Sequence, residues 1–150
     1  MGTHHRGPAA EVRALDAFVK LMRAADSVSA HLAGALADAG LSEGQFGVLE
    51  ALYHLGPLCQ CDLGAKLLRS GGNITMVVDN LEKHGLVRRQ REAADRRYIS
   101  VQLSEAGRKL IARLFPRHAA AILAEMAVLK PEEQETLGHL CRKLGRQERG

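Results

Sequence analysis

The sequence predicts a mainly helical protein that carries one small β-hairpin, an α+β fold. Apolar residues recur at steps of three and four over most of the chain, which is the period of an amphipathic helix. Aromatic residues make up only 3% and Trp is absent, so these helices are expected to pack through aliphatic side chains. A clean alternation of apolar and polar residues appears at 98–103, where a strand is expected.

The composition of this 150-residue chain limits the class of protein. Its length is typical of one domain. No apolar run approaches the ~20 residues that span a bilayer, and the N-terminus lacks the apolar segment of a signal peptide. We therefore expect a cytoplasmic protein without membrane contact, whose three cysteines are reduced. The sequence has no nucleophile–base signature, phosphate loop or metal-ligand spacing, so we expect neither an enzyme nor a cofactor or metal site.

A long helix is expected near the N-terminus. Residues 1–8 have no periodicity and are expected to form a mobile tail. An apolar stripe that includes Leu15, Phe18 and Met22 then runs through residues 9–40. Helix of this extent is about 45 Å long. In a small protein, such a helix is expected to pack against more than its own domain.

The next helix has a defined start and stop. Ser42 is placed to cap it, with Gln45 bonding back to Ser42. Leu41 and Phe46 occupy the two hydrophobic-staple positions. The pair Gly56-Pro57 ends the helix.

Two short helices joined by a tight turn are expected after a two-residue strand at 58–59. The first helix covers 61–68, and a break falls at 69–72. The apolar residues of the second helix repeat at the spacing of a buried face: Ile74, Val77, Val78 and Leu81. Its opposite face is polar. Such a pair is a helix-turn-helix, a motif that presents its second helix to DNA.

A β-hairpin is expected after this helix pair. Gly85 and Leu86 fit a Schellman stop at the end of the second helix. Strands are predicted at 86–91 and 98–103, and residues 92–97 form a projecting finger between them. A hairpin in this position is the wing of a winged helix.

Two further helices follow from Ser104. Pro116 lies inside the first helix and is expected to bend it, whereas Pro131 fits the first position of the second. Residues 146–150 are expected to fray. The apolar side of the last helix contains Leu137, Leu140, Cys141 and Leu144. We expect Cys141 to lie in the core.

Positive charge is concentrated in the predicted hairpin. Between Lys83 and Arg97 there are six basic residues against Glu92 and Asp95, so this segment carries +4, the net charge of the whole chain. A basic patch of this kind suits a polyanion such as nucleic acid. An ordinary solvated surface has the same pattern, so charge alone leaves both interpretations open.

Four segments of the chain form a recognisable set: 41–46, 74–87, 95–97 and 103–107. Each short motif is weak alone, but their order and spacing together are specific. Through them the chain resembles the MarR family of winged-helix transcriptional regulators. The resemblance covers about residues 12–145 and keeps the order of elements of that family.

The resemblance implies a winged helix-turn-helix DNA-binding domain at 41–103 and a homodimer formed by helices in 9–40 and 104–145. It also implies a palindromic operator on double-stranded DNA, and repression relieved by a small phenolic or other anionic ligand. Some members of the family sense oxidants through cysteine instead. Two departures from the family are Gly71-Gly72 and Met76, where many members carry bulkier polar residues and Arg.

The N-terminal end of the second helix of the motif is expected to read bases. Asn73 suits pairing with adenine, and the methyl groups of Thr75 and Met76 suit contact with thymine. An A·T-leaning half-site is therefore expected. Gly71 and Gly72 either let backbone amides approach a phosphate or only form the turn.

In the wing, Asp95 and Arg97 are two residues apart, so on an extended strand they point the same way. The carboxylate then orients the guanidinium for the minor groove, which is the role that the resemblance implies for Arg97. The alternative is a surface ion pair. The other arginines of the wing are expected to contact phosphates. The full expected DNA-contact set is Ser70, Gly71, Gly72, Asn73, Thr75, Met76, Lys83, Arg88, Arg89, Arg91, Asp95, Arg96 and Arg97.

Two weaker signals leave alternatives open. Cys59 and Cys61 form a C-x-C pair whose thiols point apart on extended chain, and either redox sensing or ordinary packing is compatible with it. Phe46, Tyr53 and His31 are candidates for binding an effector, although each also suits a core or interface position. The remaining rival is a winged-helix protein-interaction module without DNA binding, whose wing would not concentrate arginine.

Overall fold

The computed structural model describes residues 2–67, 74–95 and 97–146. The mainly helical fold with a small sheet is confirmed, and element boundaries lie within two residues of those expected. The elements are α1 (Ala9–Asp38), α2 (Glu43–Leu55), β1 (Leu58–Cys59), α3 (Gln60–Lys66), α4 (Ile74–Lys83), β2 (Val87–Arg91), β3 (Ile99–Leu103), α5 (Glu105–Met126) and α6 (Pro131–Gly145).

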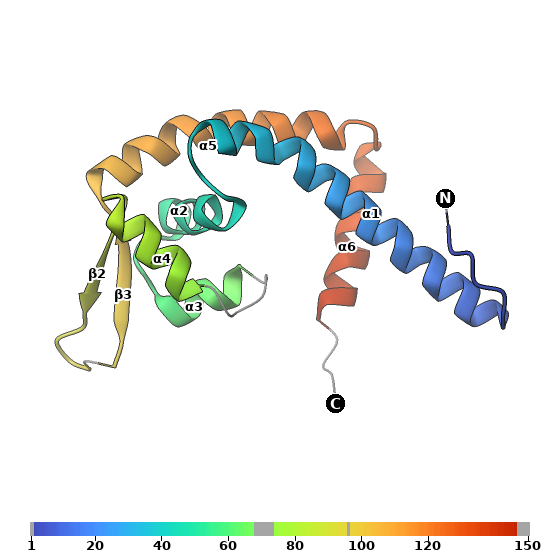
Figure 1. Cartoon of the computed structure of the whole chain (residues 1–150), viewed down its shortest axis with the longest axis horizontal. Helices are drawn as coiled ribbons and strands as arrows, with labels where there is room; N and C mark the ends of the chain where they lie inside the picture. Colours follow the sequence, from blue (N-terminus) through green and yellow to red (C-terminus); the bar gives the residue numbers. More distant parts are fainter. Residues whose placement is uncertain (1, 68–73, 96, 147–150) are drawn as a thin grey trace.

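Figure 1 shows how these elements are arranged. Helices α2, α3 and α4 form one lobe with the strands, and the β2–β3 hairpin projects from it as a wing. Helix α5 arches over this lobe and contacts both α2 and α1. Helices α1 and α6 extend away from the lobe at the opposite end of the molecule. The wing tip and the N-terminal end of α4 both lie at the lower side of the lobe in this view.

The strands form an antiparallel sheet in the order β1-β3-β2. In the hairpin, Val87 pairs with Leu103 and Arg91 pairs with Ile99. The two-residue strand β1 pairs Leu58 with Val101. Strand β3 of the wing is therefore held to the body of the lobe by β1. Only the outer end of the β2–β3 hairpin projects from the lobe.

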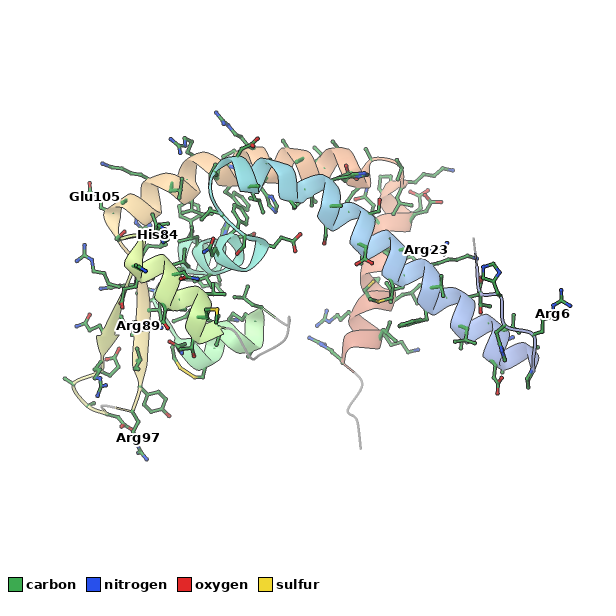
Figure 2. The ribbon with its side chains drawn as sticks, in the orientation of Figure 1. Arg6, Arg23, His84, Arg89, Arg97 and Glu105 are labelled. Atoms are coloured by element: carbon green, nitrogen blue, oxygen red, sulfur yellow. A yellow bond between two sulfur atoms is a disulfide. The ribbon has the colours of Figure 1, made fainter. Side chains whose placement is uncertain are left out.

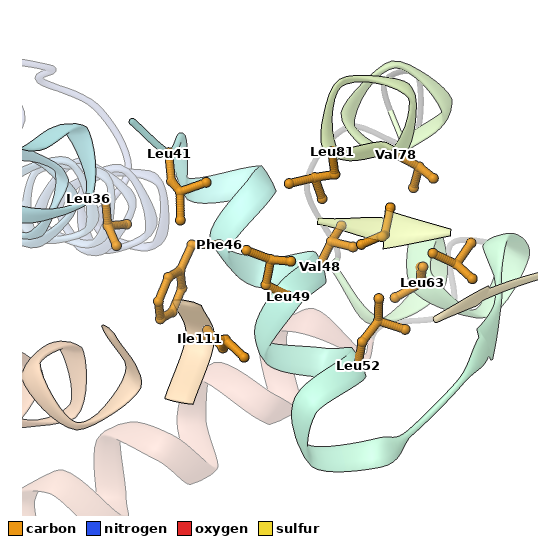
Figure 3. Packing of buried hydrophobic residues seen from close by; sticks show 12 residues of the cluster. Leu36, Leu41, Phe46, Val48, Leu49, Leu52, Leu63, Val78, Leu81 and Ile111 are labelled. Carbon is orange, nitrogen blue, oxygen red and sulfur yellow. The ribbon is translucent and has the colours of Figure 1, made fainter. Parts of the chain in front are cut away.

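Helix α2 lies at the centre of the core. Figure 3 shows its buried side chains between α4, α3 and the start of α5. Burial of each large aliphatic side chain stabilises the fold by about 1.5–3 kcal/mol. The expected inward face of α4 is confirmed, because Val78 and Leu81 are buried and Ile74 and Val77 are partly buried. The buried core residues are Leu36, Leu41, Phe46, Val48, Leu49, Leu52, Leu63, Val78, Leu81, Val87, Val101 and Ile111.

The helix ends follow the local signals in the sequence. The backbone N–H of Gln45 donates to Ser42 Oγ at 3.1 Å, and that of Ser42 donates to Gln45 Oε1 at 2.9 Å, which completes a capping box. At the end of α4, Gly85 has a φ of 73°, and the N–H of Leu86 donates to the carbonyl of Leu81 at 2.9 Å. This bond is the mark of the expected Schellman stop.

The end of α4 is joined tightly to the start of α5. Ser104 Oγ donates to the carbonyl of Gly85 at 2.6 Å and accepts from the N–H of Gly107 at 3.0 Å. A Cβ on Gly107 would overlap the carbonyl oxygen of Leu86. Only glycine permits this close approach of α5 to the chain that follows α4. Helices α4 and α5 therefore share one rigid junction.

Helix α5 continues through Pro116 and its ribbon curves across the top of the molecule in Figure 1. Helix α6 begins at Pro131, as expected, and none of its residues is buried within the chain. Within the described part of the chain, no helix is long and apolar enough to cross a bilayer. We call the following exposed side chains of α1 and α6 the terminal apolar residues: Leu15, Phe18, Met22, Leu137, Leu140 and Leu144.

Candidate nucleic-acid interface

Helix α4 presents a polar and exposed outer face. Thr75 is exposed, and Met76 is 59% exposed although its side chain is apolar. Lys83 is exposed at the other end of the helix. The expected contacts of the preceding turn, Ser70, Gly71, Gly72 and Asn73, lie outside the described residues.

Arg97 lies at the tip of the wing (Figure 2), where 90% of its side chain is exposed. Its Nε and Nη2 donate to Oδ1 and Oδ2 of Asp95, each at 3.1 Å, and its backbone N–H donates to Oδ1 at 3.0 Å. The expected pairing of these two residues is confirmed. The geometry differs from that expected, because both residues lie in the turn beyond the strands and the pairing depends on a backbone contact as well. Arg96 lies outside the described residues.

The contact with Arg97 changes the acidity of Asp95. The two side-chain hydrogen bonds from Arg97, followed by the bond from the Arg97 backbone N–H, hold the pKa of Asp95 below the ordinary 3.8. Asp95 is therefore a carboxylate throughout the neutral range. The wing tip presents a guanidinium that is already oriented before any partner arrives.

Arg88 and Arg91 are exposed on β2, as phosphate contacts require. Arg89 is different, because only 20% of its side chain is exposed. Strand alternation explains this difference: Arg89 shares the face of Val87, which is buried. The alternation of side chains along the predicted strand was the signal in the sequence that could have shown that Arg89 faces the protein and Arg88 faces solvent.

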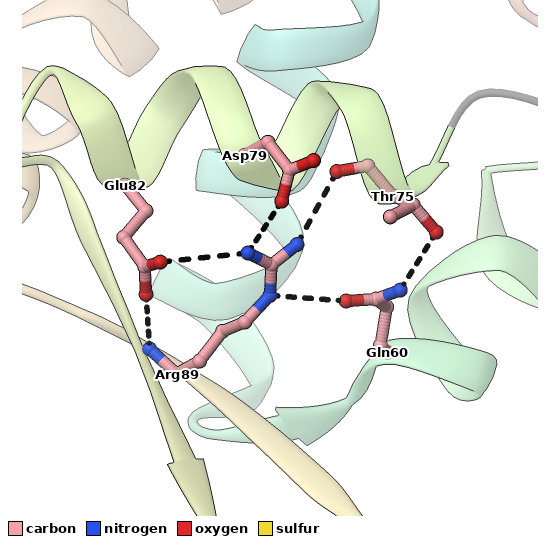
Figure 4. A network of polar contacts seen from close by, with 5 residues as sticks. All are labelled: Gln60, Thr75, Asp79, Glu82 and Arg89. Carbon is pink, nitrogen blue, oxygen red and sulfur yellow. Dashed lines mark hydrogen bonds and ion pairs between the residues drawn. The ribbon is translucent and has the colours of Figure 1, made fainter.

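Arg89 is engaged with the protein and not with solvent (Figure 4). Its Nη1 lies 2.5 Å from Asp79 Oδ1 and 3.4 Å from Glu82 Oε1, and its backbone N–H donates to Glu82 Oε2 at 2.9 Å. Its Nε donates to Gln60 Oε1 at 3.2 Å and its Nη2 to the carbonyl of Thr75 at 3.2 Å. This position does not fit the phosphate contact expected from the sequence. Arg89 instead ties the wing to α4 and to the start of α3.

The cysteines also differ from expectation. Cys59 and Cys61 are joined by a disulfide, whereas the sequence predicted reduced thiols pointing apart. The chain turns from β1 into α3 between them, so they do not lie on one extended segment. Their Sγ atoms and a carboxylate oxygen of Asp62 lie within 4.8 Å of one another, but the disulfide leaves no thiolate for a metal. Cys141, expected in the core, is exposed on α6.

The structure does not bring the three effector candidates together. Phe46 is only 2% exposed and its ring centroid lies 4.3 Å from that of His118. Tyr53 packs against His54, and His31 Nδ1 lies 3.0 Å from Glu125 Oε2 on α5. None of these candidates lines the open pocket of about 360 Å³ on α2 and α3. Its lining residues are Gly47, Glu50, Ala51, His54, Leu55, Lys66 and Leu67.

A short helix pair with an exposed polar face on its second helix, followed by an arginine-tipped hairpin, defines a winged helix-turn-helix DNA-binding protein. The sequence model of the MarR family matches residues 41–99. The chain is also 37% identical over 133 residues to the HTH-type transcriptional regulator MhqR of Bacillus subtilis (strain 168), covering 89% of this chain and 92% of that protein. The chain therefore belongs to the MarR family of transcriptional regulators. It is a DNA-binding regulator rather than an enzyme or a protein-interaction module.

Solved structures agree with this assignment. The MarR family regulator Sco3205 from Streptomyces coelicolor, in complex with DNA, matches with a TM-score of 0.82 and 26% identity, over 95% of this chain and 91% of that one. BpsR of Bordetella bronchiseptica matches with a TM-score of 0.77 and 26% identity, over 85% and 97%. DNA binding by BpsR is regulated by 6-hydroxynicotinic acid.

Proposed function

We propose that the protein is a homodimeric repressor of a palindromic, A·T-leaning operator, and that a small aromatic anion relieves repression. The observation that carries this proposal is the exposed Arg97 guanidinium, held by Asp95 at the wing tip. Narrow A·T minor grooves have an enhanced negative potential that attracts arginine. We also infer that the protein acts in the cytoplasm, where its DNA target lies.

The proposed DNA contacts are divided between two elements. Helix α4 and the turn before it face the major groove, with Thr75 and Met76 near the base edges. The wing faces the minor groove through Arg97. Asn73 is proposed to read a base as well, by pairing with adenine. The phosphate contacts and supporting residues are Ser70, Gly71, Gly72, Lys83, Arg88, Arg91 and Arg96. Arg89 is assigned to holding the wing against α4, because its guanidinium is already bonded to Asp79 and Gln60.

The proposed dimer is formed by the helices in 9–40 and 104–145, which flank a DNA-binding domain at 41–103. The terminal apolar residues support it. Phe18 is 58% exposed, Leu140 60% and Leu144 53%, and such apolar area is costly in water. A two-fold partner that covers these side chains would present two recognition helices about one helical turn of DNA apart.

The pocket on α2 and α3 supports binding of an aromatic anion. Leu55 and Leu67 supply apolar contacts, and the lining also includes the cationic side chain of Lys66 and the hydrogen-bonding ring of His54. BpsR, a relative in fold, responds to an aromatic acid. Phe46 is proposed to support this site from the core of α2 rather than touch the ligand.

Selection of bound sequences from random double-stranded DNA with the purified protein tests the proposal. We expect a palindrome whose half-sites are about one helical turn apart. The matched control is Arg97→Ala, which should enrich the same major-groove bases but lose the flanking A·T preference. Recovery of no enriched sequence by the wild-type protein would overturn the proposed function.

The Cys59–Cys61 disulfide favours a second candidate, regulation by oxidation. Two thiols and one hydroperoxide would give the disulfide, one alcohol and one water. Closing the disulfide would fix the junction of β1 and α3, and α3 packs against α4. Operator affinity should then change between thiol-reduced and peroxide-treated protein, and the Cys59→Ser variant should show no such change. Equal affinity of the wild-type protein in both states would exclude this candidate.

A further inference from the structure

Three side chains form a directed series of hydrogen bonds that ends on the outer face of α4 (Figure 4). Arg89 Nε donates to Gln60 Oε1 at 3.2 Å, and Gln60 Nε2 donates to Thr75 Oγ1 at 3.0 Å. Asp79 holds the guanidinium from the other side. The series therefore runs from a fixed cation, through an amide, to the exposed hydroxyl of Thr75.

The orientation of the Gln60 amide is decided by its neighbour. An arginine Nε–H only donates, so the group that faces it must be the amide oxygen. The amide nitrogen of Gln60 then faces Thr75 and also only donates. The hydroxyl oxygen of Thr75 accepts this bond, and among the residues that the structure describes no acceptor lies opposite its proton, which can therefore be given to a group outside the protein.

Hydrogen bonds that run head to tail strengthen one another. A hydroxyl that accepts a bond from an amide, itself polarised by a guanidinium, becomes a better donor and a poorer acceptor. The second bond from Arg89, Nη2 to the carbonyl of Thr75 at 3.2 Å, fixes the backbone that carries this hydroxyl. The direction of the hydroxyl is thus set by residues of α3 and β2 rather than by α4.

We propose that Gln60 and Arg89 are positioning residues that make Thr75 a hydrogen-bond donor toward DNA, and that this sets the base it selects. This inference rests on the proposed contact of Thr75 with the operator. In the major groove, thymine O4, guanine O6 and N7, and adenine N7 are acceptors, adenine N6 is a donor, and cytosine offers only its N4 donor. Thr75 therefore selects thymine or guanine over cytosine at the base that it faces.

The test uses two pyrimidines with the same methyl group and opposite hydrogen-bonding groups at C4, and Thr75→Val controls for the accompanying change of the paired purine from adenine to guanine. Thymine and 5-methylcytosine carry the same methyl group, but thymine presents O4 and 5-methylcytosine presents an amino group. A scan of the selected operator with wild-type protein and Thr75→Val locates the position at which the hydroxyl acts. At that position, the wild-type protein should bind the thymine duplex about threefold to tenfold more tightly than the 5-methylcytosine duplex.

The decisive variant is Gln60→Glu. A carboxylate at 60 accepts from both Arg89 and the Thr75 hydroxyl, which leaves only lone pairs of Thr75 facing the base. The added negative charge should weaken binding to all DNA, but the ratio between the two duplexes should invert in favour of 5-methylcytosine. The ratio is measured on one protein preparation, so a partly unfolded variant does not disturb it.

Thr75→Val provides the control for Gln60→Glu. In the Thr75→Val background, Gln60→Glu should lower affinity without changing the ratio between the two duplexes. An unchanged ratio in the single Gln60→Glu variant, or a wild-type preference for 5-methylcytosine, would overturn the inference while leaving operator binding intact. Absence of any selected operator would overturn the proposed function and this inference with it.

Discussion

Asp95 accepts three hydrogen bonds from Arg97, two from its guanidinium at 3.1 Å and one from its backbone N–H at 3.0 Å. Arg97 would otherwise lose side-chain entropy when it enters a groove. A carboxylate already charged at neutral pH removes part of that cost, because the guanidinium is oriented before binding. The wing tip is thus prepared for its proposed partner by a contact local to the turn.

Removal of the Arg97 guanidinium should weaken operator binding without unfolding the protein. We expect Arg97→Ala to lower affinity by roughly 1–3 kcal/mol in fluorescence anisotropy. Arg113→Ala is the matched control, because it removes the same charge from α5, outside the wing. Equal losses for the two variants would mean that net charge, and not the wing contact, determines affinity.

Asp95 should titrate below the ordinary aspartate value of 3.8, because Arg97 bonds favour its charged form. A carboxyl whose pKa is lower in the folded than in the unfolded protein stabilises the fold at every pH above its unfolded-state pKa. This contribution disappears as the pH falls through the folded-state pKa. The contribution of Asp95 to the stability of the fold is thus constant from about pH 5 to about pH 8. Carbon-detected NMR of the side chain checks this directly. In Arg97→Ala the titration midpoint should rise toward 3.8, and a wild-type midpoint at or above 3.8 would contradict the pairing in solution.

Gly107→Ala should destabilise the protein, because its Cβ would overlap the carbonyl oxygen of Leu86. We expect the free energy of unfolding to fall by about 1–3 kcal/mol in denaturant titrations, as for other overpacked sites. Gly34→Ala is the control, since among the described residues nothing beyond its own stretch of α1 lies within 4 Å of its Cβ position. There the free energy should rise by up to about 1 kcal/mol through helix propensity. Similar values for both variants would show that the α4–α5 junction relaxes freely.

Leu140→Glu should disrupt the proposed dimer by placing a charge among the terminal apolar residues. Light scattering should give about twice the 16.3 kDa chain mass for the wild-type protein, and the single-chain mass for this variant. Arg142→Glu puts the same side chain off the apolar side of α6 and should leave the mass unchanged. A wild-type protein of single-chain mass at micromolar concentration would refute the dimer.

Arg88 and Arg89 should behave differently although they are neighbours. Arg88→Ala should reduce the slope of log affinity against log salt by about one unit, as expected for a lost phosphate contact. Arg89→Ala should weaken binding by freeing the wing from Asp79 and Glu82, with no comparable loss of slope. A one-unit loss in both variants would restore the phosphate role for Arg89.

Much of the fold was predictable because its signals are local. The Ser42 capping box, the stop at Gly85 and the alternation of β3 each depend on a few consecutive residues. The exposure of Arg97 and its pairing with Asp95 were predictable for the same reason. Steric and hydrogen-bonding rules over short spans are the same in any tertiary setting.

The sequence by itself determined the order of elements, the inward face of α4 and the charged wing tip. Only the tertiary structure decided what Arg89 does, because its partners Asp79 and Gln60 come from α4 and α3. The turn from β1 into α3 brings Cys59 to Cys61, and β1 itself depends on its pairing with the distant strand β3. Helix and strand periods define which face of an element is apolar, whereas the direction of a polar side chain depends on the groups that other elements place beside it.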